Sequence, residues 1–427
     1  MKARIAYLFI LFAAAGTILL SCEANGGSIY ATIETEQKAT TNTLPTLMTV
    51  ADIVVQPSGT YYVAAGGIFR GVLDTVKNTV AWTPNNPTGS TPAYPFNPIY
   101  GGVTKVAPYD LCNSLAYFNT HFWGGFYTGS DDPATSSNNV GLVRFDATAT
   151  AATGGTQVST VSDGQVTMLR AEGSYLFMST ATSTSSLLAP TYDLEYSSDG
   201  ATWATVPGMT SLPYPVVGMA YDGTNYWAVT RGIDVWQVTN GVDTKTTNYN
   251  VIYKGASPGS LSVLATPPAL THTAGQPNDG YNDIFVDPTT HTVFVPSIQD
   301  GVNVSTDAGA TWTAVTTPAI GGTTPVSFLT VSATLNPGTN TIYLAGSDGY
   351  GYYTLSTGTN PATLTRQSST TILLYGESVS KIIVDGSNVL MGTNLNGVWR
   401  TQFGTDGNLQ SGASWTHESG GATTSTG

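Results

Sequence analysis

The sequence is poor in charge and in the residues that favour helices. Only 10% of its 427 residues are charged, and Lys and Arg together number 14. Because Lys, Arg, Glu and Gln are strong helix formers, their scarcity disfavours long helices. The chain is instead rich in β-branched and aromatic runs broken by Gly, Asn, Asp and Pro, which predicts an all-β protein. Since 41% of the residues are apolar and 23 are Tyr, the composition excludes a wholly disordered chain.

Cysteine is almost absent, and the first of the two cysteines lies in a targeting segment. Lys2 and Arg4 precede the apolar run 5–20, which is followed by "LLSC" ending at Cys22. This segment resembles a bacterial lipoprotein signal, which implies that residues 1–21 are removed and that Cys22 carries the lipid. The alternatives are a plain secretory signal and an uncleaved anchor, although the run is short for a membrane span. Cys112 would then be the only thiol, unable to form an internal disulfide and predicted to be a buried apolar side chain.

The charge balance is acidic, with a net charge of −13. Loss of Lys2 and Arg4 would leave 12 positive against 27 negative side chains, a net of −15. Such a surface disfavours nucleic acid as a partner. It also means that attachment to a membrane would depend on the lipid and not on a basic patch. Residues 22–48 are predicted to be a polar tether, and residues 419–427 a disordered tail.

One pattern recurs seven times between these ends. It consists of an apolar strand, a tight polar turn, a second apolar strand and a third strand that follows a Gly or a loop. The third-strand positions advance by about 55 residues on average. Four antiparallel strands repeated seven times predict a seven-bladed β-propeller over residues 49–418. The predicted third-strand positions are Arg70, Arg144, Tyr196, Gln237, Val304, Thr354 and Arg400.

Two short stretches, "SSDGATWAT" at 197–205 and "STDAGATWTAV" at 305–315, contain a spacing that neither helix nor strand requires. They resemble the Asp-box, or BNR repeat, of sialidase-like propellers. The resemblance implies a hairpin turn between the third and fourth strands, with a structural role for its residues. In that role the Asp accepts hydrogen bonds from backbone N–H groups, the Gly takes a positive φ and the Trp packs on the blade. The residues are Asp199, Gly200, Trp203, Ser305, Asp307, Gly309 and Trp312.

The order of strands in a propeller separates its connections onto two ends. Turns between strands one and two and between strands three and four emerge at one end, here called the first rim. Connections between strands two and three and from one blade to the next emerge at the other, the second rim. The long insertions 84–104, 129–140, 181–191 and 256–280 are predicted on the second rim, which makes it the predicted binding face for a glycan or a protein. The candidate binding residues are Tyr94, Phe96, Tyr100, Asp131, Asp132, Tyr214 and His272.

Catalytic and metal-binding patterns are not found. The sequence lacks nucleophile-elbow, zincin, P-loop and paired-cysteine motifs, and the four His have no ligand spacing. No catalytic residue, metal site or cofactor is therefore predicted. Sialidases need three arginines around the substrate, whereas Arg70, Arg144 and Arg400 are predicted on third strands away from the axis. Endoglucanases with Asp-boxes use an Asp pair, but Asp283 and Asp287 on one strand would lie about 13 Å apart, too far for such a pair.

The leading interpretation is a monomeric, lipid-anchored envelope protein that binds through its second rim and is not an enzyme. Two alternatives stay open, a carbohydrate-active hydrolase on the same scaffold and a structural envelope protein. The layout of signal, lipid and seven blades also resembles the lipid-anchored propellers that help assemble photosynthetic reaction centres. Those use an arginine-rich patch that this chain lacks, so their role is not transferred.

Overall fold

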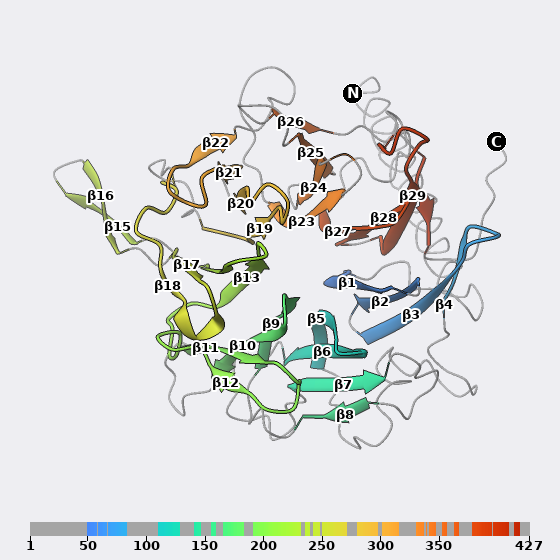
Figure 1. The fold of residues 1–427 in the computed structure, drawn as a ribbon, viewed down its shortest axis with the longest axis horizontal. Coiled ribbons are helices and arrows are strands. Elements are labelled where there is room, and N and C mark those ends of the chain that lie inside the picture. The colour runs from blue at the N-terminus through green and yellow to red at the C-terminus, as the bar shows by residue number, and fades with distance from the viewer. Residues whose placement is uncertain are drawn as a thin grey trace, which may run out of the picture.

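The protein is a ring of seven four-stranded sheets in the computed structural model (Figure 1). The structure describes residues 49–57, 59–65, 67–82, 110–128, 141–146, 155–158, 165–182, 191–231, 235–239, 242–247, 250–270, 280–297, 301–315, 330–336, 339, 341–346, 352–356, 363–366, 378–394, 396–409 and 414–418. The helical content of these residues is one short 3₁₀ turn, Pro258–Ser260. Nowhere in the described part of the chain is there a helix long and apolar enough to cross a membrane. The all-β, seven-bladed prediction is confirmed.

Each blade takes four antiparallel strands from one stretch of chain. Blades one and two comprise β1 (Asp52–Gln56), β2 (Thr60–Ala65), β3 (Gly67–Asp74) and β4 (Thr79–Trp82), then β5 (Asp110–Phe118), β6 (His121–Thr128), β7 (Leu142–Asp146) and β8 (Gly155–Gln157). Blades three and four comprise β9 (Gln165–Glu172), β10 (Tyr175–Thr182), β11 (Thr191–Ser197) and β12 (Ala204–Thr205), then β13 (Val216–Tyr221), β14 (Tyr226–Thr230), β17 (Ile252–Gly255) and β18 (Ser262–Val263). Blades five to seven comprise β19 (Phe285–Val286), β20 (Val293–Pro296), β21 (Val302–Ser305) and β22 (Thr313–Val315), then β23 (Thr330–Asn336), β24 (Thr341–Gly346), β25 (Tyr352–Ser356) and β26 (Thr363–Arg366), then β27 (Val379–Asp385), β28 (Asn388–Thr393), β29 (Val398–Gln402) and β30 (Thr416–His417).

The fourth blade corrects one prediction. Gln237 lies in β15 (Val235–Thr239), which pairs only with β16 (Val242–Thr247) and is not the third strand of the blade. The third strand is β17, whose Tyr253 pairs with Ala228 of β14. The β15–β16 hairpin is thus inserted between the second and third strands, and Figure 1 shows it projecting from the ring. The prediction failed because β15 carries the same apolar alternation as a blade strand.

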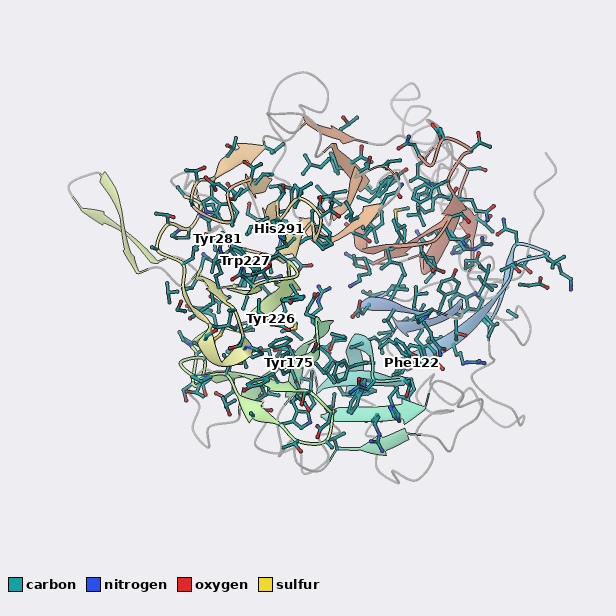
Figure 2. All side chains as sticks on the ribbon, in the orientation of Figure 1. Phe122, Tyr175, Tyr226, Trp227, Tyr281 and His291 are labelled. Carbon is teal, nitrogen blue, oxygen red and sulfur yellow. The ribbon has the colours of Figure 1, made fainter. Side chains whose placement is uncertain are left out.

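The hydrophobic core lies between the blades. Seven separate clusters of buried side chains each join one blade to the next, including blade seven to blade one. Phe122 of blade two, for example, packs on Tyr62 of blade one, and Trp227 of blade four shares a cluster with Tyr281 of blade five (Figure 2). Cys112 is free and buried in the cluster between blades one and two, as its sequence context predicts. Since apolar burial is the main driving force for folding, each blade depends on both neighbours.

Within the part of the chain that the structure describes, the ring closes without an exchanged strand, because blades one and seven are each built from consecutive strands. Val50 N–H donates to the Thr393 carbonyl at 2.9 Å, and the Ser380 hydroxyl donates to the Val50 carbonyl. Farther out, the Arg400 guanidinium donates to Asn78 of blade one and to Glu418. The alternative of an outer strand from residues 28–34 concerns residues outside the described ones. We call this junction of blades one and seven the seam.

The connections are distributed unequally between the rims. The longest links leave and re-enter the ring at the second rim, namely 83–109 between blades one and two, 231–251 within blade four and 264–284 between blades four and five. The first rim carries turns as short as 119–120 and 386–387, and its longest is 403–415. The predicted insertion 256–280 is divided, because 256–261 forms the β17–β18 turn on the first rim and only the remainder follows β18.

Candidate functional site

The innermost strands bring charged side chains together around the axis of the ring. Five of these strands, β5, β9, β13, β23 and β27, share a register shift near their second-rim ends, of the kind a β-bulge produces. At the same level, Asp52 opens β1 and Asp283 precedes β19. Each carboxylate accepts the N–H of the following residue at 2.9 Å, Ile53 in one case and Ile284 in the other. The two acids therefore occupy matching positions.

Asp52 is held by three neighbouring blades. Its Oδ1 atom lies 2.7 Å from Lys381 Nζ of blade seven, and its Oδ2 accepts the Leu115 N–H of blade two at 2.8 Å. Both charged side chains are nearly buried, with 10% and 12% of the Asp52 and Lys381 side chains exposed. A buried pair of this kind is costly to break, because the remaining charge would be left without its partner. Asp52 is therefore a structural residue of the seam.

Asp283 makes a longer-range pair. Arg170 of β9 in blade three donates from Nη2 to Asp283 Oδ2 of blade five at 3.0 Å. Blade four lies between them in the ring, and it presents Gly218 at this level. A Cβ on Gly218 would lie 2.6 Å from Asp283 Oδ1 and 2.7 Å from the Ile284 backbone nitrogen. The absence of a side chain at Gly218 therefore leaves room for Asp283 to meet Arg170.

Glu172 lies two residues beyond Arg170 on β9, and residues two apart on a strand share a face. Burial raises the pKa of the Glu172 carboxyl from 4.5 to about 7, Arg170 lowers it in part, and Asp283 raises it further. The same Asp283 raises the pKa of Arg170. Near neutral pH Glu172 is thus about half protonated, so it contributes less than a full negative charge to the axis.

Arg231 lies on the second-rim side of Asp283. It follows β14, and its backbone N–H donates to the carbonyl of Pro215, just before β13. Its Nε donates to the Tyr281 carbonyl at 3.2 Å, on the second-rim side of Asp283. The pKa of Arg231 is lowered by burial, and the negative charge of Asp283 offsets this only in part. Among the described residues neither terminal nitrogen of Arg231 has a hydrogen-bond partner.

The two predicted Asp-box turns have matching hydrogen bonds. Asp307 Oδ1 accepts the Thr311 N–H at 2.8 Å, and the Ser305 hydroxyl accepts the Gly309 N–H at 2.8 Å. Asp199 Oδ1 accepts the N–H groups of Ala201 and Thr202 at 2.8 and 2.7 Å. Hydrogen bonds from the Thr311 hydroxyl and N–H lower the pKa of the Asp307 carboxyl to about 2, and those from the Thr202 and Ala201 N–H groups lower the pKa of Asp199 to about 2. Among the described residues, the groups that donate to the two carboxylates all belong to the same motif stretches, which supports a structural role.

Each of these turns also packs on the preceding blade through its glycine. Gly200 has φ +75° and its Cα faces the ring of Trp123 in blade two, while Gly309 has φ +90° and faces Trp227 in blade four. Trp203 and Trp312 of the motif are half-buried. The packing roles of Trp123 and Trp227 could not be predicted from the sequence, because both lie on second strands and carry no local motif.

Of the predicted binding residues, Tyr214 alone lies in the described part of the chain. It is half-buried in the link 206–215 at the second rim. Cys22, Tyr94, Phe96, Tyr100, Asp131, Asp132 and His272 lie outside the described residues. Asp287 accepts the Thr289 N–H at 2.9 Å within the turn after β19, as a turn residue would. Within the described part of the chain no group of three or more His, Cys, Asp or Glu could hold a metal ion.

Comparison with known proteins supports the fold but assigns the chain to no family. No protein-family model matches the sequence, and neither does any curated protein. Among solved structures, two of the extracellular domain of BT4673 from B. thetaiotaomicron, described as a one component and as a hybrid two component system, have TM-scores of 0.50 and 0.51 at 10% and 11% identity. They cover 84% and 85% of this chain, which spans only 39% of each of theirs. The structure of YCF48 bound to D1 peptide matches with a TM-score of 0.49 at 10% identity, over 85% of this chain and 94% of that one. At these identities the likeness shows the propeller fold.

Proposed function

We propose that the chain is a binding protein of the bacterial cell envelope, held to a membrane by a lipid on Cys22 and using its second rim to bind a glycan or a protein. The observation that carries the proposal is the unequal distribution of connections, since the three longest links all belong to the second rim. Long connections on a rigid scaffold are commonly functional. The extracellular domain of BT4673, which shares the fold, supports an envelope location.

The experiment is binding of the purified chain to a glycan array and to a set of envelope proteins. The joint substitution of Tyr94, Phe96 and Tyr100 by Ala should reduce the binding at least about tenfold, since aromatic anchors dominate such interfaces. A matched control is Val76→Asp, because Val76 is 93% exposed on the first rim. Equal loss of binding in the control, or none in the triple variant, would contradict the assignment of the binding face.

Membrane attachment is tested separately by Cys22→Ser, which should move the protein from the membrane to the soluble fraction. Retention of this variant on the membrane would contradict the lipid anchor. Turnover of a labelled polysaccharide in the binding assays would favour the hydrolase alternative. A raised pKa on a buried acid is a property of general acids, so Glu172→Gln would then be the first variant to assay.

A further inference from the structure

We propose that the second-rim end of the ring axis binds the carboxylate of a ligand through Arg231. This deepens the proposed function, because it names a chemical group recognised on the same rim. It rests on Arg231, on the pairing of the other charges around the axis, and on the net charge that results.

The carboxylate oxygens of Asp52 and Asp283 near the axis are already occupied. Both oxygens of Asp52 have partners, with Ile53 N–H and Lys381 on Oδ1 and Leu115 N–H on Oδ2. The oxygens of Asp283 accept from Ile284 N–H and Arg170. Among the described residues, neither acid therefore pairs with Arg231, whose guanidinium uses only Nε in a hydrogen bond to protein.

Arg231 is also placed where a ligand could reach it. Arg231 is exposed to solvent, although packing around its guanidinium lowers its pKa, and it lies closer to the second rim than Asp283 and Arg170 do. A guanidinium presents its donors as a planar fork that matches a carboxylate with two parallel bonds. Since Nε is bound to the Tyr281 carbonyl, the planar fork is fixed in orientation, and among the described residues its two terminal nitrogens have no hydrogen-bond partner.

The charge at the axis favours a single negative charge on the ligand. Arg170, Arg231 and Lys381 face Asp52 and Asp283, with Glu172 half protonated near neutral pH. The net charge of these six side chains is thus positive but less than about one, although the whole chain carries a net charge of −13. A phosphate dianion would add a second negative charge beside Asp283 and within an acidic protein. A carboxylate, with one charge and planar geometry, fits this arrangement better.

The test is ligand-observed NMR titration of the full-length chain with matched pairs of probes. The pairs are galacturonate with galactose, and a short peptide with a free carboxyl end with its amide. Inorganic phosphate is a fifth probe. We expect one carboxylate probe or both to bind at least about tenfold more tightly than its neutral counterpart, and to bind more tightly than phosphate. Whichever carboxylate probe binds more tightly shows whether the recognised group comes from a sugar acid or from the end of a peptide.

The variants are Arg231→Gln, Arg231→Lys and Lys77→Gln. Arg231→Gln should weaken carboxylate binding at least about tenfold without a matching loss of thermal stability, and Arg231→Lys should fall between it and the native chain. Lys77→Gln removes the same charge from the first rim, where 76% of the Lys77 side chain is exposed, and should leave affinity unchanged. Absence of carboxylate binding, tighter phosphate binding, or equal affinity in Arg231→Gln would each overturn the inference. Binding of a neutral glycan or protein by the second rim in those cases would leave the proposed function standing.

Discussion

Lys381 of blade seven and Asp52 of blade one form a buried ion pair, with 2.7 Å between Nζ and Oδ1. The pair joins the first and last innermost strands of the ring. Because Asp52 also accepts the Leu115 N–H of blade two, one carboxylate links three consecutive blades at the seam.

Lys381→Met should therefore destabilise the protein by about 3–5 kcal/mol, since it leaves the Asp52 charge buried without its cation. The double variant with Asp52→Asn should be less destabilised than Lys381→Met. Denaturant unfolding of the single and double variants measures the coupling. Lys77→Met is the control, because the Lys77–Asp74 pair is exposed and solvent-screened and should contribute little to stability. Equal effects of the two lysine substitutions would contradict the role of the seam pair.

Gly218→Ala should destabilise the protein by at least about 2 kcal/mol, because the new methyl group would collide with Asp283 and with the Ile284 backbone nitrogen. Gly259→Ala provides the control, since nothing lies within 4 Å of a Cβ at that position and its φ is not positive. That variant should change the free energy of unfolding by less than about 0.5 kcal/mol. If Gly218→Ala left the stability unchanged, the Arg170–Asp283 pair would not depend on the space left by the missing side chain at position 218.

Gly200→Ala tests the contact between a turn and the preceding blade. The added Cβ would lie 2.3 Å from the Trp123 ring, and φ is +75°. Gly208→Ala has nearly the same backbone cost, with φ +77°, but has open space around it. The difference between their free energies of unfolding therefore isolates the collision, which we expect to add about 1–3 kcal/mol. Identical values would mean that the turn does not pack on Trp123.

Glu172 should make the protein less stable as the pH rises. Its pKa is about 7 when folded against 4.5 for the free side chain, so between these values the folded state binds the proton and the unfolded state does not. Stability is then full below pH 4.5 and is lost progressively up to about pH 7. The loss is about 2 kcal/mol once partial exposure is allowed for. Glu172→Gln should remove this slope in unfolding experiments between pH 4.5 and 8, and an unchanged slope would assign it to other groups.

The fold was predictable because every blade repeats the same alternation of apolar strands and polar turns. The one wrong strand, the assignment of Gln237, shows the limit of that signal. The β15–β16 hairpin alternates as a blade strand does, and only its pairing reveals that it belongs to no blade. The second-rim position of the link 83–109 followed from the strand order alone. The link 231–251 was missed together with Gln237, and the division of 256–280 depended on β18, a strand of two residues.

The charged axis could not be predicted from sequence. Arg170 and Asp283 are 113 positions apart, and their contact depends on the register of three different strands and on the absence of a side chain at Gly218. In the sequence Asp283 could be compared only with the nearby Asp287, which lies too far along the strand to pair with it, and nothing indicated a distant arginine. The partner of a buried charge is set by the closure of the ring, which no local spacing records.

The seam has a consequence for how such a chain can change in length. Every sheet is complete within one uninterrupted segment, and the described residues of blades one and seven exchange no strand. A duplication or deletion of about 55 residues would therefore add or remove a whole blade without splitting a sheet. The segment that encodes one blade is therefore also the segment that recombination would insert or delete, so the number of blades in the ring can change by one at a time.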